Sequence, residues 1–138
     1  MTRRLSLALL CALGAGWLPG GPRLSAQQPG AQRVKSTLTT AVFTEQQAER
    51  GRETYDQACA FCHRTDLSGN EDGARALRGS AFLERWNDRP LADLSFIIKE
   101  TMPQDDPKSL SPSESAAIVA YILKRNGAPA GQTELPPD

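Results

Sequence analysis

The chain has 138 residues, of which 39% are hydrophobic, and its 16 lysine and arginine residues balance its 16 aspartate and glutamate residues. This length allows one domain. The balanced charge, with no large block of one sign, supplies no strong basic field that would indicate nucleic acid or an anionic membrane surface as a partner, and we predict that the chain binds no nucleic acid.

Residues 1–26 have the pattern of a secretory signal peptide. Arg3 and Arg4 form a positive start, residues 5–18 form a short apolar run, and small residues end the segment. An uncleaved membrane anchor is the alternative, but it needs roughly 20 apolar residues, and this run is shorter and stops at the Pro-Gly-Gly-Pro of residues 19–22. We therefore predict cleavage, export to the periplasm, and no membrane span in the mature chain. Cleavage removes three arginines and no acidic residue, which changes the net charge from zero to −3.

Residues 27–42 are polar and lack a helical period, so we predict a flexible linker there. The first helix is predicted over residues 43–58, where Thr44 and Gln47 have the spacing of a capping box. Gly51 and Tyr55 fall on one face of this helix. Because a glycine inside a helix costs about 1 kcal/mol relative to alanine, we interpret Gly51 as a point where another backbone approaches closely.

The sequence Cys-Ala-Phe-Cys-His follows this helix directly, at residues 59–63. It has the C-x-x-C-H spacing of c-type haem attachment. The thiols of Cys59 and Cys62 can each form a thioether with one haem vinyl group. His63, the only histidine of the chain, can then bind the iron as the proximal ligand. The motif therefore predicts one covalently bound haem c.

Two other kinds of site use a C-x-x-C pair. A thioredoxin-like redox pair lies at a helix N-terminus, where the helix dipole lowers the thiol pKa, whereas this pair follows a predicted helix. Structural zinc needs a second pair of ligands, and the remaining cysteine, Cys11, lies in the predicted signal peptide. Both alternatives are less consistent with the sequence than haem attachment.

Residues 64–79 are rich in glycine, aspartate and asparagine, which predicts a loop. Leu77 is its main apolar residue, and we expect it to cover part of the haem. A short helix is predicted over residues 80–88. It carries Trp86, which either packs in the core or donates its indole N–H to a haem propionate, and we favour core packing.

A second clear helix is predicted over residues 90–101, and Pro103 ends it. Met102 therefore lies at the helix exit, before a polar loop over residues 104–110. Apart from the initiator, Met102 is the only methionine, and no second histidine exists. Since the haem iron has a sixth coordination position, we predict Met102 as the distal ligand.

The last helix is predicted to run to about residue 126. Ser111 and Glu114 form a capping box around Pro112 at the first helical position, and Gly127 stops the helix. The tail over residues 128–138 is rich in proline and glycine, so we expect it to be disordered.

Over residues 43–127 these features resemble a class I (mitochondrial-type) monohaem cytochrome c of bacterial periplasms. In that family, a glycine and an aromatic residue before the first cysteine pack against an aromatic residue of the C-terminal helix, and Gly51, Tyr55 and Tyr121 match those positions. The resemblance implies an all-α cytochrome c fold, with three main helices and a short one around one haem. One departure exists: Arg75 stands where the family usually has a proline whose carbonyl region receives the histidine N–H.

The resemblance implies a one-electron carrier, not an enzyme, with Cys59 and Cys62 holding the haem and His63 and Met102 binding its iron. It also implies redox protein partners: a dehydrogenase as donor, for example a quinoprotein, and an oxidase or another cytochrome of the respiratory chain as acceptor. The chain would act as a monomer or as the cytochrome subunit of a complex. The alternative is a haem protein that binds or senses a ligand, which requires Met102 to leave the iron.

Overall fold

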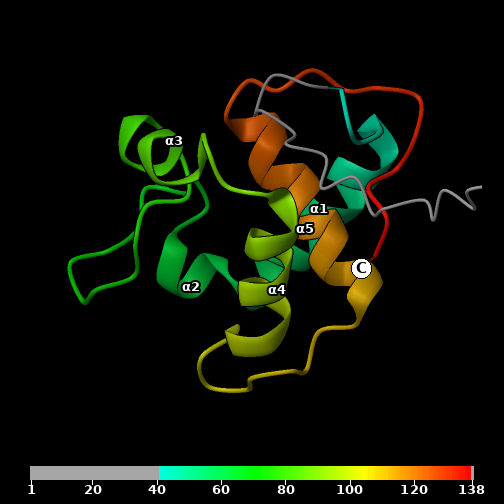
Figure 1. The fold of residues 1–138 in the computed structure, drawn as a ribbon. Coiled ribbons are helices and arrows are strands. Elements are labelled where there is room, and N and C mark those ends of the chain that lie inside the picture. The colour runs from blue at the N-terminus through cyan, green and yellow to red at the C-terminus, as the bar shows by residue number, and fades with distance from the viewer. Residues whose placement is uncertain (1–40, 138) are drawn as a thin grey trace, which may run out of the picture. The chain divides into compact units, whose positions relative to one another are not determined.

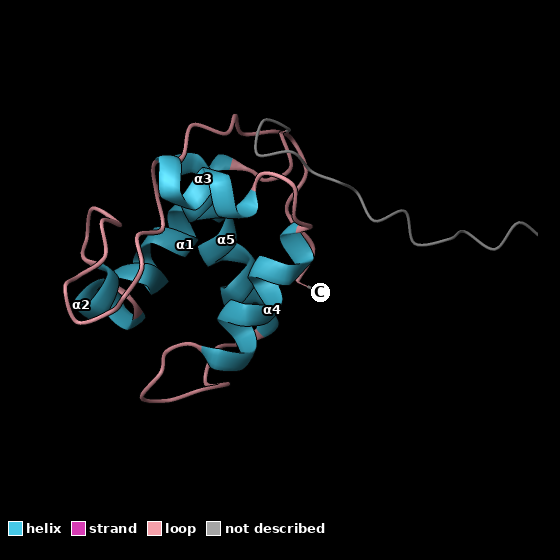
Figure 2. Cartoon of the chain, turned by 60° about the vertical axis from the view of Figure 1, so that its left-hand side comes forward, coloured by secondary structure: helices cyan, strands magenta, loops and turns pink. Residues whose placement is uncertain are grey.

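A computed structural model of the chain describes residues 41–137, in which helices are joined by loops (Figure 1). No strand occurs among these residues (Figure 2), which confirms the predicted all-α class. The predicted signal peptide and nearly all of the predicted linker lie outside the described residues. The helices are α1 (Glu45–Ala58), α2 (Ala60–His63), α3 (Ser80–Trp86), α4 (Leu91–Thr101) and α5 (Pro112–Arg125).

The predicted helices α1, α3, α4 and α5 are confirmed with small changes at their ends, but the haem-attachment motif differs from the expectation. We expected the motif at the end of the first helix, and it forms the separate helix α2 instead. Helix α1 stops because Cys59 has φ −124° and ψ −33°, outside the α-helical region. Helical hydrogen bonding begins again directly after Cys59, since the N–H groups of Cys62 and His63 donate to the Cys59 carbonyl at 3.2 and 2.9 Å.

Helices α1 and α5 cross at the centre of the fold (Figure 1), and Gly51 lies at their contact. A Cβ atom at Gly51 would lie 1.8 Å from the Ala117 carbonyl oxygen of α5. Beside it, the rings of Tyr55 and Tyr121 pack at a tilt of 56° with their centroids 5.2 Å apart, a favourable geometry for aromatic pairs. The close backbone approach predicted for Gly51 is therefore confirmed, as is the pairing of the two tyrosines.

The capping box is complete at the start of α5 but only half formed at the start of α1. At α5, Ser111 and Glu114 exchange both hydrogen bonds of a capping box, with Pro112 at the first helical position. At α1, the Thr44 hydroxyl accepts from the Gln47 N–H at 3.1 Å, so the cap is confirmed. The Gln47 side chain does not complete the box, because its amide bonds to the C-terminal tail.

The tail is ordered against α1, in contrast to the disorder expected from its composition. The Gln47 amide donates to the Leu135 carbonyl and accepts from the Leu135 N–H, both at 2.8 Å. Arg50 pairs with Glu134 at 2.7 Å, and the Gly131 N–H donates at 2.6 Å to the carbonyl of Phe43, just before α1. Long-range hydrogen bonds thus supply the order that local propensity does not predict.

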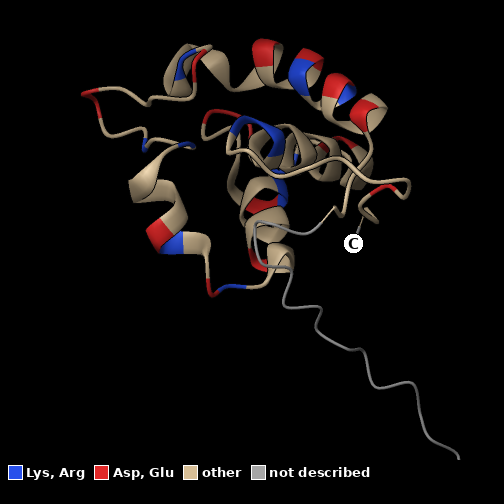
Figure 3. Cartoon of the chain, turned by 90° about the horizontal axis from the view of Figure 1, so that it is seen from above, with Lys and Arg blue, Asp and Glu red and all other residues tan. Residues whose placement is uncertain are grey.

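The core lies where α1 and α4 each pack against α5, and it includes side chains of α3. Acidic and basic residues are interspersed over the helices and loops (Figure 3), in agreement with the mixed charge of the sequence. In the described part of the chain, no helix is long and apolar enough to cross a membrane. The large side chains that are fully buried include Phe43, Tyr55, Leu67, Phe82, Ile118, Ile122 and Leu123.

Candidate haem site

The imidazole of His63 is held by a single backbone contact. Its Nδ1 lies 2.8 Å from the carbonyl oxygen of Arg75. A carbonyl can only accept a hydrogen bond, so Nδ1 carries a proton, and in the neutral imidazole Nε2 then has the free lone pair. The carbonyl therefore fixes the tautomer and the orientation that a metal-binding histidine needs. Arg75 stands where the family usually has a proline, and its own carbonyl accepts the hydrogen bond from the histidine.

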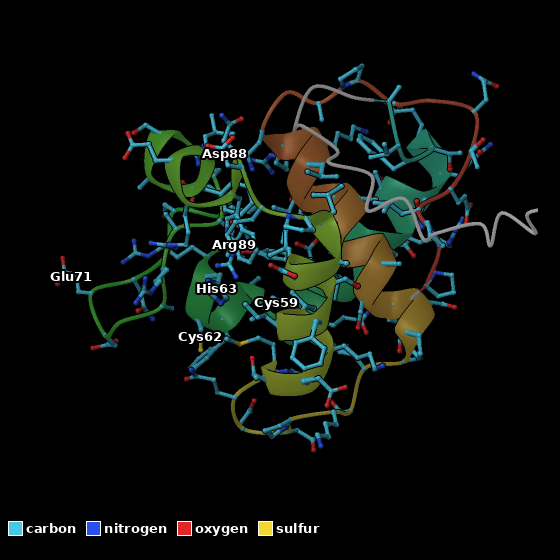
Figure 4. All side chains as sticks on the ribbon, viewed as in Figure 1. Cys59, Cys62, His63, Glu71, Asp88 and Arg89 are labelled. Atoms are coloured by element: carbon cyan, nitrogen blue, oxygen red, sulfur yellow. The ribbon has the colours of Figure 1, made fainter. Side chains whose placement is uncertain are left out.

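Cys59 and Cys62 are both free thiols, one helical turn apart (Figure 4). Cys62 is exposed, whereas Cys59 is partly buried against the core. Burial raises the pKa of the Cys59 thiol to about 11, and the neighbouring Cys62 adds to that increase. A thioredoxin-like pair requires the opposite, a lowered thiol pKa. The site thus offers two unoxidised thiols in one turn, without the electrostatics of a disulfide-exchange enzyme.

The loop that supplies the Arg75 carbonyl is tightly folded although it lacks the proline. Gly69 donates to the His63 carbonyl at 3.1 Å, and Leu77 donates to the Leu67 carbonyl at 2.9 Å. Gly69 has φ +77°, and a Cβ there would lie 2.3 Å from the Ala74 carbonyl oxygen. Only glycine fits this position without strain. Hydrogen bonds and close backbone packing therefore restrain the loop in place of the proline ring.

Two further residues fix this loop, and the sequence analysis did not assign them that role. The Tyr55 hydroxyl donates to the Arg64 carbonyl at 2.8 Å, and burial raises the pKa of Tyr55, which keeps the hydroxyl protonated as a donor. At the end of α5, the Asn126 side chain donates to the Leu77 carbonyl at 2.9 Å and accepts from the Gly79 N–H at 3.0 Å. In the sequence, the position of Asn126 directly before the helix-ending Gly127 was the only local feature that could have indicated this role.

Met102 lies directly after α4, as predicted. Its N–H donates to the Ile98 carbonyl at 3.1 Å and closes the last turn. The residue is partly buried. In Figures 1 and 2 the C-terminal end of α4 lies on the same side of the α1–α5 crossing as α2. The fold thus brings the segments that carry the two predicted axial ligands, His63 and Met102, to one side of the core, although 39 positions separate these residues in the sequence.

Comparison with known proteins identifies the family of the chain. The family described as "Cytochrome C oxidase, cbb3-type, subunit III" matches residues 46–122, from the first turn of α1 to α5. This match covers more than half of the chain and includes the whole C-x-x-C-H motif. The chain belongs to this cytochrome c family. It is an electron-transfer protein, and its cofactor is a c-type haem.

Two curated relatives are similar to this cytochrome. The cytochrome bc1 complex cytochrome c subunit of Corynebacterium diphtheriae is 27% identical over 128 residues, which cover 92% of this chain and 44% of the relative. Photosystem II extrinsic protein V of a Synechococcus species is 40% identical over 63 residues, which cover 44% of this chain and 34% of the relative. The aligned parts thus span less than half the length of both relatives. No solved structure matches the chain.

The residues of the structure fit the haem that the family implies. Two free thiols stand one turn apart, and a histidine beside them has its Nδ1 occupied and its Nε2 free. Partly buried apolar side chains, among them Leu77, Leu83 and Ile97, pack at the edge of the core and leave apolar surface for a large planar group. Covalent attachment suits such a small domain, because its core alone is limited in size.

Trp86 belongs to the core, as we favoured from the sequence. It is buried, and its indole ring lies 6.3 Å from the ring of Phe82. The guanidinium carbon of Arg89 lies over the Trp86 ring at 4.5 Å from the ring centroid, a cation–π distance.

Proposed function

We propose that this cytochrome holds one haem c through thioethers at Cys59 and Cys62, with His63 and Met102 as the two axial ligands of the iron. With both axial positions filled by protein, the iron would exchange one electron and bind no substrate. The reaction is then outer-sphere electron transfer between redox proteins. The observation that best supports this proposal is the hydrogen bond between His63 Nδ1 and the Arg75 carbonyl, because it leaves Nε2 as the only available ligand nitrogen.

The side chains have distinct roles in this proposal. A c-type haem supplies the Fe(III)/Fe(II) couple. Cys59 and Cys62 tether the group, and the Arg75 carbonyl keeps the His63 imidazole basic and correctly turned. A thioether ligand such as Met102 raises the reduction potential of the site relative to a second imidazole. The apolar side chains around the site lower the local dielectric constant, which also favours the less charged ferrous state.

The partners and the compartment are part of the proposal. The Corynebacterium relative is, by its name, a subunit of a cytochrome bc1 complex, and the family is described as an oxidase subunit. By analogy, we propose that this cytochrome passes electrons within a respiratory chain, in the periplasm, as a free carrier or as a subunit of a larger complex. A dehydrogenase, for example a quinoprotein, is the donor that the class I resemblance implies.

Carbon monoxide binding to the reduced, matured protein tests the ligation. Carbon monoxide binds ferrous haem only where an axial position is open. We expect no change in the visible spectrum of the wild-type protein and a prompt change in Met102→Ala, which opens the distal position. A prompt change in the wild-type protein would contradict the closed iron site and favour ligand binding or sensing. His63→Ala should lower the yield of the low-spin protein, because no second histidine can replace the proximal ligand.

A further inference from the structure

The loop between Met102 and α5 is held in place by few contacts. Two turn-type hydrogen bonds lie within it: Asp106 N–H to the Pro103 carbonyl at 3.1 Å, and Ser109 N–H to the Asp106 carbonyl at 3.3 Å. No hydrogen bond ties residues 103–109 to another part of the chain that the structure describes. The backbone hydrogen bonds alone therefore leave this segment free to move away from α4 as one unit.

One ion pair crosses the loop. Lys108 Nζ lies 3.5 Å from a carboxylate oxygen of Glu100, which is in the last turn of α4, two residues before Met102. The Glu100 side chain is only 26% exposed, whereas Lys108 is 71% exposed. Lys108 also has φ +68°, a left-handed conformation that residues other than glycine seldom adopt. The residue that pairs with Glu100 of α4 thus also has a strained backbone conformation.

We infer that Lys108 is a positioning residue for Met102. Its ion pair with Glu100 closes residues 100–108 into a short ring that contains Met102, and this closure resists the outward movement by which the sulfur would leave the iron. The inference rests on the proposed function, because it takes Met102 as the distal ligand. An exposed ion pair has a small effect, so the expected change is modest and has to be measured against a matched control.

Lys99 supplies that control. Its Nζ lies 3.6 Å from the other oxygen of the same Glu100 carboxylate, but Lys99 is the neighbouring residue of α4 and closes no loop. Lys99→Gln and Lys108→Gln therefore remove the same charge from the same carboxylate, and only the second opens the ring. Glutamine keeps a Cβ at position 108, so the backbone strain stays and only the ion pair is lost. Lys108→Arg should restore the pair.

The experiment measures the rate of carbon monoxide binding to the ferrous protein, together with the sulfur-to-iron charge-transfer band of the ferric protein. We expect Lys108→Gln to bind carbon monoxide about two- to fivefold faster than wild type, as the size of an exposed ion pair implies. Lys99→Gln and Lys108→Arg should behave like wild type. At about 1 M salt the difference between wild type and Lys108→Gln should shrink, because screening weakens the pair.

Each outcome decides between the two proposals. Equal rates for Lys108→Gln and wild type, or equal increases for Lys108→Gln and Lys99→Gln, would overturn the positioning role while leaving Met102 as the ligand. A fall in overall stability without a faster reaction would also overturn it, since that is the result of a purely structural contact. If wild type bound carbon monoxide as fast as Met102→Ala, the proposed ligation itself would fail, and this inference with it.

Discussion

The crossing of α1 and α5 at Gly51 allows a quantitative test of the fold. Alanine is a better helix former than glycine by about 1 kcal/mol, so in an isolated helix Gly51→Ala would be stabilising. In the folded protein the added Cβ would lie 1.8 Å from the Ala117 carbonyl oxygen and 2.4 Å from its carbon. Both neighbours are backbone atoms, so no side chain can rotate away.

The helices would have to separate to accommodate the methyl group. To move the contact from 1.8 Å to an ordinary 3.4 Å requires a shift of about 1.6 Å between the two backbones. A gap of that size removes much of the dispersion energy along the contact, including the Tyr55–Tyr121 pair. Overpacking of this kind typically costs 1–3 kcal/mol and occasionally more. Because both neighbours are backbone atoms, we expect a cost near the upper end of this range, and after the gain of about 1 kcal/mol in helix propensity the free energy of unfolding should fall by about 2 kcal/mol.

The assay is urea unfolding of the matured protein, followed by far-ultraviolet circular dichroism. Gln57→Ala is the control, because Gln57 is an exposed residue of the same helix and its replacement should change stability by less than about 0.5 kcal/mol. We expect a lower urea midpoint for Gly51→Ala alone, at an unchanged slope. An equal or higher midpoint would show that helix propensity outweighs the clash, and would refute the close crossing of the two helices.

Three further substitutions test the contacts that hold the loops and the tail. Gln47→Ala should lower the free energy of unfolding by about 1–3 kcal/mol, because it leaves tail groups without partners, and the loss should vanish in a chain that ends at Gly127, as urea midpoints of both chains would show. Asn126→Ala should cost a similar amount in the same urea assay and should also broaden the NMR signals of the Arg75 loop, whereas an unchanged loop spectrum would contradict the bridge. Ser111→Ala should cost about 1 kcal/mol at neutral pH. Hydrogen bonds from the Ser111 side chain and backbone hold the pKa of Glu114 below its ordinary value, so this cost should shrink as the pH falls through the folded-state pKa and the carboxylate is protonated; a cost independent of pH would argue against the capping box.

Several features of this cytochrome could be predicted from the sequence because they depend on local chemistry. The C-x-x-C-H spacing specifies haem attachment within one helical turn, and Pro103 ends α4 because proline cannot continue a helix. Gly51 indicated a close contact because its only advantage within a helix is its missing side chain. Capping residues at Thr44 and Ser111 set the starts of α1 and α5 for the same local reason.

The features that sequence reasoning left open or missed depend on groups that carry no local signal. Any residue has a backbone carbonyl, so only the folded loop could decide that the carbonyl of Arg75 orients His63. Gln47 has the spacing of a capping box, but its buried amide forms two hydrogen bonds with Leu135 of the tail instead. The sequence by itself thus determined the helices, the motif and the candidate ligands. Tertiary structure alone decided which backbone groups and distant side chains hold them, because those contacts join residues that lie far apart along the chain.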